Sequence, residues 1–273
     1  MPLRSRADGT LVEHVHPVRR IMPFVMPGRN EAFVLFEQQI ALAPLQSRLA
    51  RLNAARPPAR AATLFHLVLH ALGETFSAFP RLNRFVAGGQ LYDRRGIWLS
   101  FSAKTALERD ASIFTAKLEF LPGESLASMI DRCQALVGRE RAAPDTATER
   151  EVRGFLRLPA SVLRVGTRLM RWADGHNLLP ARFIAGDPLY ASAFVANLGS
   201  VGLDAAFHHL YEYGSIPIFV TIGRVRRVAV VHEDGSVGSR DVLPLRYTYD
   251  ERTEDGFYAA RALEHFQALL ETP

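Results

Sequence analysis

The chain has 273 residues, of which 48% are hydrophobic and 22% charged, a composition that excludes a wholly disordered protein and supplies a sizeable core. The formal net charge of +5 is spread along the chain, without the concentrated basic stripe of a nucleic-acid-binding protein. The sequence contains no apolar run long enough to span a membrane and no signal-peptide core, and its single cysteine, Cys133, excludes an internal disulfide framework. We expect a soluble cytoplasmic protein that has neither a membrane nor a nucleic acid as a partner.

Hydrophobic spacing predicts strands and helices in mixed order through the first half of the chain. The expected strands are 32–42, 84–87, 90–92, 97–103 and 113–120, and the expected helices are 44–53, 61–79 and 124–137. The helix 61–79 is apolar nearly all round and ends at Pro80, which indicates a buried helix. In 113–120, apolar residues alternate with polar ones, as in a strand with one buried face.

The second half of the chain is richer in strands. The polar stretch 138–149 is the expected flexible connection, followed by helices at 149–158 and 160–173. Strands are expected at 191–197, 216–222, 226–232 and 242–249, with a turn at Asp234 and Gly235, and a last helix at 257–270. Because strands and helices do not alternate strictly, the pattern favours an α/β sandwich with a mixed sheet. We expect one domain over residues 12–273 and an N-terminal arm over residues 1–11.

A cluster of charged residues separates the last strand from the last helix. It consists of Asp250, Glu251, Arg252, Glu254 and Asp255, followed by Gly256. The simplest interpretation is a loop whose acidic side chains complement the positive end of the helix.

Four segments together resemble a known enzyme family. Residues 250–256 (DERTEDG) are similar to the D-H-R-x-x-D-G motif of the catalytic domain of dihydrolipoyl acyltransferases from 2-oxo acid dehydrogenase complexes. Residues 194–202 (FVANLGSVG) resemble the segment S-N-L-G-x-x-G of that family, 216–223 its following strand, and 79–83 (FPRLN) its h-P-x-h-N motif. More distantly the chain resembles chloramphenicol acetyltransferase. The resemblance implies the chloramphenicol-acetyltransferase-like two-layer α/β sandwich, and a homotrimer with active-site channels between subunits.

Two catalytic positions of that family carry other residues in this chain. Glu251 stands where the motif has its general-base histidine, and Ala196 stands where the family has the hydroxyl that stabilises the oxyanion. A carboxylate of pKa about 4.3 removes a proton poorly from a thiol of pKa about 8.5. Loss of one oxyanion donor costs roughly 2.7–4 kcal/mol in other enzymes. Ordinary acyl transfer is therefore expected to be impaired.

The resemblance also implies which residues take part in the remodelled site. Asp255 corresponds to the acid that pairs with an arginine from the N-terminal region, and here either Arg19 or Arg20 supplies that partner, with Arg20 preferred. His208 or His209 is a candidate relocated base near neutral pH. The alternative is that one of these histidines is a core residue and the other an exposed loop residue. The expected catalytic set is Glu251, Asp255, His208, His209 and Arg20.

Substrate contacts are expected around the segment that contains Ala196. The candidates are Ser192, Ala196, Asn197 and Ser200, with Ser192 or Ser200 as a replacement hydroxyl. We expect no metal site, because the pair His66 and His70, four residues apart, lacks a third ligand.

A basic helical face is predicted in the region after the flexible connection. It consists of Arg157, Arg164, Arg168 and Arg171. Such a face is usually a solvated surface, and contact with the phosphates of coenzyme A is the alternative.

Two functions follow from these observations. The first is a stand-alone acyltransferase-like protein that uses coenzyme A or an acyl thioester as substrate, binds no cofactor tightly and has Glu251 in place of the usual histidine. The second is a catalytically inactive trimeric scaffold or regulatory homologue. No lipoyl-domain sequence precedes the expected domain, so we expect no lipoyl arm.

Overall fold

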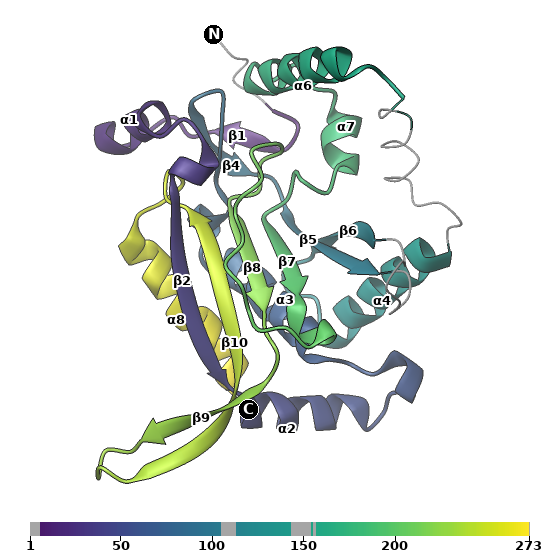
Figure 1. Ribbon diagram of the computed structural model, residues 1–273, viewed down its shortest axis with the longest axis vertical. Helices are drawn as coiled ribbons and strands as arrows, with labels where there is room; N and C mark the ends of the chain where they lie inside the picture. Colours follow the sequence, from purple (N-terminus) through teal and green to yellow (C-terminus); the bar gives the residue numbers. More distant parts are fainter. Residues whose placement is uncertain (1–5, 105–112, 143–153, 155–156, 273) are drawn as a thin grey trace.

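Two β-sheets organise the computed structural model, which describes residues 6–104, 113–142, 154 and 157–272 (Figure 1). The large sheet has the strand order β2-β10-β8-β7-β5-β6, and β9 pairs with the first part of β10. The small sheet has the order β1-β4-β3. The strand bounds are β1 Gly9–Leu11, β2 Phe33–Ala41, β3 Phe85–Ala87, β4 Gln90–Arg94, β5 Ile97–Lys104, β6 Ile113–Phe120, β7 Ala193–Asn197, β8 Ile218–Ile222, β9 Arg226–Val231 and β10 Val237–Asp250.

The large sheet is mixed. Strand β7 runs parallel to both of its neighbours, β5 and β8. The remaining pairs of this sheet are antiparallel. The mixed sheet expected from the sequence is therefore confirmed.

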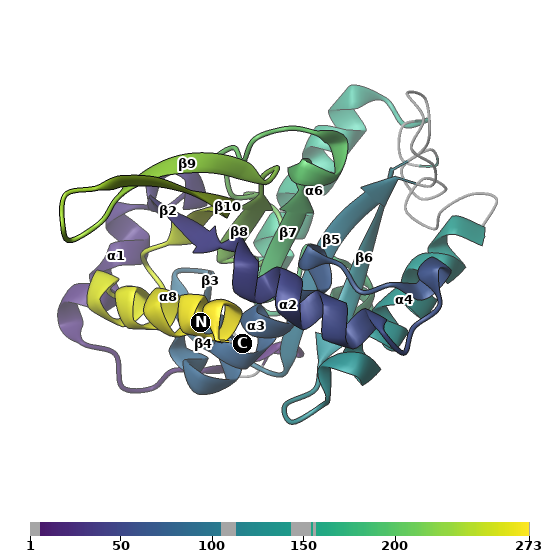
Figure 2. The ribbon, with the colours of Figure 1, turned by 90° about the horizontal axis from the view of Figure 1, so that it is seen from below.

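A layer of helices covers one face of the large sheet. The helix bounds are α1 Pro17–Val25, α2 Leu42–Asn53, α3 Leu64–Ala78, α4 Leu126–Ala142, α6 Ala160–Gly175, α7 Ala181–Gly186 and α8 Gly256–Glu271. Helices α2, α3, α4 and α8 lie side by side beneath the strands (Figure 2), and the main core forms where Val220 and Leu245 of the sheet meet Phe76 and Phe266. The result is the expected two-layer sandwich. Within the described ranges, no helix combines the length and the apolar character that crossing a bilayer requires.

The opposite face of the large sheet, which we call the open face, has no such layer of helices. It carries a smaller apolar cluster that includes Phe194 and Phe219, partly covered by the segment 203–217. Residues directly opposite each other in adjacent strands share a face, and the register carries this face from Phe219 through Thr248 to the edge strand β2. There Phe33 and Leu35 remain 39% and 42% exposed.

Most predicted elements lie within a few residues of their expected bounds. The stretch 138–149 was expected to be flexible, but its first residues belong to α4, because Arg and Glu continue a helix well. Residues 143–149 and most of the expected helix 149–158 lie outside the described residues. Strand β10 begins at Val237 because pairing with β9 extends it beyond the expected start.

Three elements near polar or proline-rich sequence have no counterpart in the prediction. Strand β1 lies inside the expected N-terminal arm and pairs with β4. Arg6 of the same region is buried, because Asp8 and Asp174 pair with its guanidinium. The short helices α1 and α7 contain or follow prolines, which usually indicate a break.

Candidate functional site

The charged turn after β10 is built on a buried ion pair. Asp250 and Arg252 are only 1% and 3% exposed, and two guanidinium nitrogens of Arg252 each donate to one carboxylate oxygen of Asp250 at 2.8 Å. The third nitrogen of Arg252 donates to the carbonyl oxygens of Met26 and Pro27. The pair therefore ties the turn to the segment that follows α1.

Glu254 anchors the other side of the turn. Its carboxylate is buried and lies 3.2 Å from nitrogens of both Arg81 and Arg84 and 3.8 Å from Arg19. Its backbone carbonyl accepts a hydrogen bond from the hydroxyl of Tyr249. Because three guanidinium groups surround this carboxylate, Glu254 is a structural anchor and has no free oxygen to offer a substrate.

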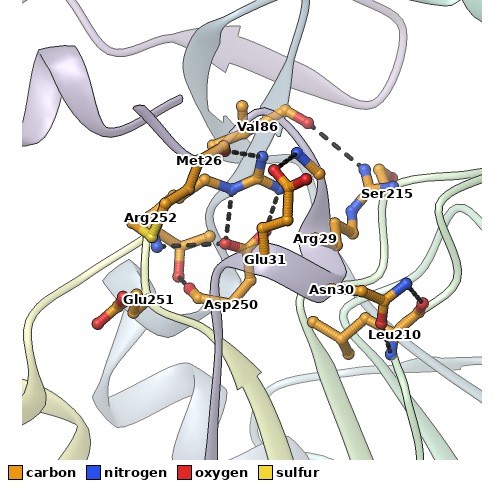
Figure 3. Close-up of polar contacts among 12 residues, drawn as sticks. Met26, Arg29, Asn30, Glu31, Val86, Leu210, Ser215, Asp250, Glu251 and Arg252 are labelled. Carbon is orange, nitrogen blue, oxygen red and sulfur yellow. Dashed lines mark hydrogen bonds and ion pairs between the residues drawn. The ribbon is translucent and has the colours of Figure 1, made fainter. Parts of the chain in front are cut away.

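Glu251, the candidate catalytic residue, lies between these two anchors. Its backbone N–H donates to the carbonyl of Ala32 at 2.9 Å, and its own carbonyl accepts from Arg19 at 3.0 Å. Its side chain is half-buried and, within the part of the chain that the structure describes, makes no hydrogen bond or ion pair. Figure 3 shows Glu251 turned away from the Asp250–Arg252 pair. The turn thus holds the backbone of Glu251 and leaves its carboxylate available.

Asp255 begins helix α8. Its Oδ1 accepts a hydrogen bond from the backbone N–H of Tyr258 at 2.9 Å, as an N-cap residue does. This bond lowers the pKa of Asp255, and the positive charge of Arg19 lowers it further. Asp255 is exposed, so it is ionised at neutral pH and contributes negative charge beside Glu251.

Within the described chain, Arg19 contacts the turn and the preferred Arg20 does not, and neither arginine forms an ion pair with Asp255. Arg19 contacts both Glu251 and Glu254. Arg20 is exposed, and its side chain has no partner among the described residues. Helix α1 begins at Pro17, and successive residues of a helix point about 100° apart. Only one of the two arginines can therefore face the turn.

His208 and His209 lie over the open face of the sheet. The ring of His208 stacks on Phe219 at 3.9 Å between centroids and on the ring of His209 at 4.4 Å. Nδ1 of His208 is 2.7 Å from the carbonyl oxygen of His209, and burial lowers the pKa of His208. Among the described contacts, neither histidine touches Glu251. The structure therefore does not bring them together with the turn in one chain.

A large cavity lies at the end of β7. We call it the β7 cavity; its volume is about 950 Å³. Ala196, Asn197 and Ser200, three of the four predicted substrate contacts, line it. Ser192 is not among its lining residues: it is fully buried, and its hydroxyl accepts a hydrogen bond from the backbone N–H of Trp98 at 2.8 Å. Ser192 is thus a structural residue.

The remaining walls of the β7 cavity are mostly apolar, with basic groups among them. Phe65 and Phe101 contribute aromatic surface. Three basic side chains also line the cavity, from Arg60, Lys104 and Arg141. The arginines of α6 do not belong to this lining.

Two titratable groups in the β7 cavity are unsuited to nucleophilic or basic catalysis. Burial raises the pKa of the Cys133 thiol to about 12, so it is not a thiolate at neutral pH. Burial lowers the pKa of His66 to about 4, and its Nδ1 already accepts a hydrogen bond from the Thr63 backbone N–H at 3.1 Å.

The turn and the β7 cavity lie at opposite ends of the sheet. Ala196 lies opposite Thr221 of the neighbouring strand β8, and Thr221 in turn lies opposite Arg246 of β10. Glu251 is five residues further along the chain, which corresponds to roughly 17 Å in a strand. One chain therefore cannot bring the carboxylate of Glu251 to a group bound beside Ala196.

Sequence reasoning did not assign roles to Arg81, Arg84 and Glu254. Arg81 lies within the FPRLN segment and Arg84 directly follows it. Their position in or beside a recognised motif could therefore have indicated a role for both arginines. The pairing of both with Glu254 depends on the approach of η3 (Pro80–Asn83) to the turn, which no local pattern encodes.

Part of the chain matches a known family. Residues 190–273 match the family described as 2-oxoacid dehydrogenases acyltransferase (catalytic domain). A search of curated proteins found no match.

Solved structures share the fold over nearly the whole chain. A probable dihydrolipoamide acetyltransferase from Listeria monocytogenes has 15% identity and a TM-score of 0.60, with 95% of this chain and 94% of that chain covered. The Azotobacter vinelandii dihydrolipoamide acetyltransferase has 18% identity and a TM-score of 0.61, with 96% of this chain and 92% of that chain covered. A chloramphenicol acetyltransferase has 13% identity and a TM-score of 0.55, with 99% of this chain and 98% of that chain covered. Residues 190–273 are therefore similar to the acyltransferase catalytic domain, and the chain as a whole has the fold of dihydrolipoamide acetyltransferase catalytic domains and chloramphenicol acetyltransferase.

Proposed function

We propose that the protein transfers an acyl group from a coenzyme A thioester at a site formed between two chains, with Glu251 in the place of the usual histidine. The proposal rests on one observation, namely which side chains of the turn after β10 already have partners. Asp250, Arg252 and Glu254 are engaged in buried ion pairs, while the carboxylate of Glu251 has no partner among the described residues and its backbone is held. A turn so constructed presents one functional group.

The spacing of the acids supports this role. In the Azotobacter vinelandii enzyme, a serine, a histidine and an asparagine four positions after that histidine were studied for their role in catalysis. Glu251 and Asp255 are likewise four residues apart. We assign Glu251 as the proton acceptor and Asp255 as the N-cap that fixes the turn to α8.

The separation between Glu251 and the β7 cavity requires a second chain. The exposed apolar residues Phe33 and Leu35 on the open face are suited to burial against a neighbour. A structure of similar fold, with 18% identity and a TM-score of 0.60, is the cubic core of a pyruvate dehydrogenase multienzyme complex. We therefore propose a homotrimer in which the turn of one chain faces the β7 cavity of the next.

The lining of the β7 cavity fits one end of an acyl thioester. Its apolar walls suit an extended pantetheine arm or an acyl chain. The three basic residues Arg60, Lys104 and Arg141 suit the phosphates of coenzyme A. Asp131, the one acidic residue among the described lining residues, is paired with Arg56 at 2.9 Å, so it does not oppose an anionic ligand.

The reaction that we propose conserves atoms and protons. A thiol, hydroxyl or amine acceptor attacks the thioester carbonyl, a bond forms to the carbonyl carbon, and its C–S bond breaks. Glu251 takes the proton of the acceptor and returns it to the departing thiolate. Ala196 offers no hydroxyl to the developing oxyanion, so the rate is expected to be low.

The same substitution favours the second candidate, an inactive trimeric homologue. The methyl group of Ala196 lines the cavity where the family has a donor. If no acyl donor reacts, the scaffold role is the better description of the protein.

A kinetic comparison of carboxylate variants tests the proposal. Release of free coenzyme A is followed with a thiol reagent, for a panel of short, branched and aromatic acyl-coenzyme A donors, with and without added thiol acceptors. We expect Glu251→Gln to lower kcat by about 10²–10⁴, and Glu251→His to retain or raise it, because an imidazole is the better base near neutral pH.

The matched control is Glu264→Gln on the exposed face of α8, where the carboxylate only pairs with Arg261. It should leave the rate unchanged. Equal rates for the wild-type protein and Glu251→Gln, or the absence of calorimetric binding of coenzyme A, would refute the proposal.

A further inference from the structure

Helix α6 exposes a continuous apolar stripe. Val162, Val165, Leu169 and Trp172 are 48%, 64%, 61% and 53% exposed. Their spacing of three and four residues places them on one side of the helix, and Leu158, 44% exposed, precedes them with the same spacing. None of the 16 residues of α6 is buried.

The charged residues of α6 are almost all basic. Arg164, Arg168 and Arg171 lie outside the stripe, and Arg157 lies just before the helix. Asp174 is the one acid between 160 and 175, and Arg6 binds it through its carboxylate at 2.7 Å and its carbonyl at 2.8 Å. The charged side chains on the exposed part of the helix are therefore basic, and the nearby acid is Glu212, which shares a pocket with these arginines and already accepts hydrogen bonds from the backbone of Arg29 and Asn30.

The helix is attached to the molecule mainly at its C-terminal end. Besides the Arg6–Asp174 pair, Gly175 packs against the turn formed by Gly88 and Gly89, where a Cβ on Gly88 would overlap the carbonyl oxygen of Gly175. The rest of α6 lies across one end of the molecule (Figure 1). An isolated helix of this length is marginal in water, so its apolar side requires a cover to be stable.

We propose that α6 lies flat on an anionic lipid surface. A short helix with a strong basic face, an apolar face of Val, Leu and Trp, and low mean hydropathy is typical of interfacial membrane helices. The apolar stripe would enter the boundary between headgroups and acyl chains, Trp172 would lie at headgroup level, and the arginines would extend to the lipid phosphates. This inference does not depend on acyl transfer, and it departs from the expectation of no membrane partner.

The charge of α6 argues against a second copy of the chain as the cover. Two copies that meet through this stripe place arginines beside arginines, with no acid from either helix to offset them. An anionic surface offsets the same charges, at roughly 1 kcal/mol for each residue near the membrane.

Vesicle co-sedimentation of the full-length protein tests the proposal. The probes are vesicles of phosphatidylcholine alone and of phosphatidylcholine mixed with phosphatidylserine. We expect binding to the mixed vesicles only, weakened by salt. The double variant Arg164→Gln, Arg168→Gln should lose about tenfold or more in affinity, and Val165→Glu and Leu169→Glu should each abolish binding.

The matched control is Val237→Glu. Val237 is an apolar residue on the hairpin of β9 and β10, and its side chain is 74% exposed. It should bind as the wild-type protein does. Several results would overturn the proposal: no binding of the wild-type protein to either vesicle, equal loss in Val237→Glu, or a change of oligomeric mass in Leu169→Glu. The last result would identify the stripe as a protein interface.

Discussion

At the scale of single residues, His66 shows how burial and capping combine. Its Nδ1 accepts the backbone N–H of Thr63 at the start of α3, so the imidazole takes the place that Glu or Gln has in a capping box. His66 is 8% exposed, and burial lowers its pKa from 6.5 to about 4. The folded protein therefore requires this ring to be neutral.

The pH dependence of stability follows from this shift. Between pH 6.5 and pH 4 the unfolded chain binds a proton at this site that the folded chain does not, so stability falls as the pH falls. From pH 7 to pH 4.5 the loss from His66 amounts to about 2–3 kcal/mol. His66→Gln keeps the capping contact and removes the titration. Urea unfolding of both proteins at these two pH values should show a smaller loss in the variant.

A matched control separates burial from general acid effects. His265→Gln changes a half-buried histidine on α8 and controls for the loss of one histidine outside the capping contact. If His66→Gln has the wild-type pH dependence, the imidazole does not titrate as its burial implies.

Residue identity allowed only part of the site to be predicted. The position of Glu251 and Asp255 in one turn followed from a short local motif, and the structure brings both to the end of β10. The partners Arg19, Arg81 and Arg84 come from distant segments. Which of them reach the turn depends on helix rotation and packing, and a sequence pattern does not contain that information.

At the scale of elements, the turn between β10 and α8 depends on the Asp250–Arg252 pair. Removing one partner of a buried pair leaves an uncompensated charge, at a cost of about 3–5 kcal/mol. We expect Asp250→Asn to destabilise the protein by this amount in urea unfolding. Arg252 also holds the carbonyls of Met26 and Pro27, so the segment after α1 should lose protection from hydrogen exchange.

The exposed pair of Asp241 and Arg227 provides the comparison, with side chains 42% and 72% exposed. Asp241→Asn should cost far less stability than Asp250→Asn in the same urea unfolding, because solvent screens an exposed pair. Similar losses for the two variants would mean that the buried pair contributes no more than a surface pair.

Elements with strong periodicity were the predictable ones. Strand β6 shows the alternation of buried and less buried residues that its sequence indicates, and α3 is buried along most of its length. Helix α1 was not predicted because it contains Pro23, and β1 because three polar-flanked residues carry no period. Such elements are stabilised by their tertiary partners, here β4 for β1.

At the scale of the whole molecule, the central feature is the distance between the two halves of the proposed site. The register that places Ala196 level with Arg246, five residues before Glu251, is determined only by the pairing of the strands.

Mixing two inactive variants tests whether neighbouring chains share a site. Glu251→Gln removes the proton acceptor, and Ala196→Trp fills the β7 cavity with a large side chain. If each site combines the turn of one chain with the cavity of another, co-refolded mixtures contain some sites with both halves intact. We therefore expect coenzyme A release to recover to a substantial fraction of the wild-type rate in the mixture. Each variant alone, refolded in the same way, serves as control, and a mixture as inactive as its components would place the whole site in one chain.

The turn at Gly88 and Gly89 has a consequence for how this architecture tolerates change. Both residues have positive φ values, of 55° and 74°, and they separate Gly175 at the end of α6 from Phe24 of α1. Only the backbone of this turn fits between the two helices, so Gly88 cannot be replaced by a residue that has a side chain. The outer surface of α6 is constrained by what it contacts, whereas the point where that helix joins the rest of the protein is constrained by space and accepts hydrogen as its only substituent at position 88.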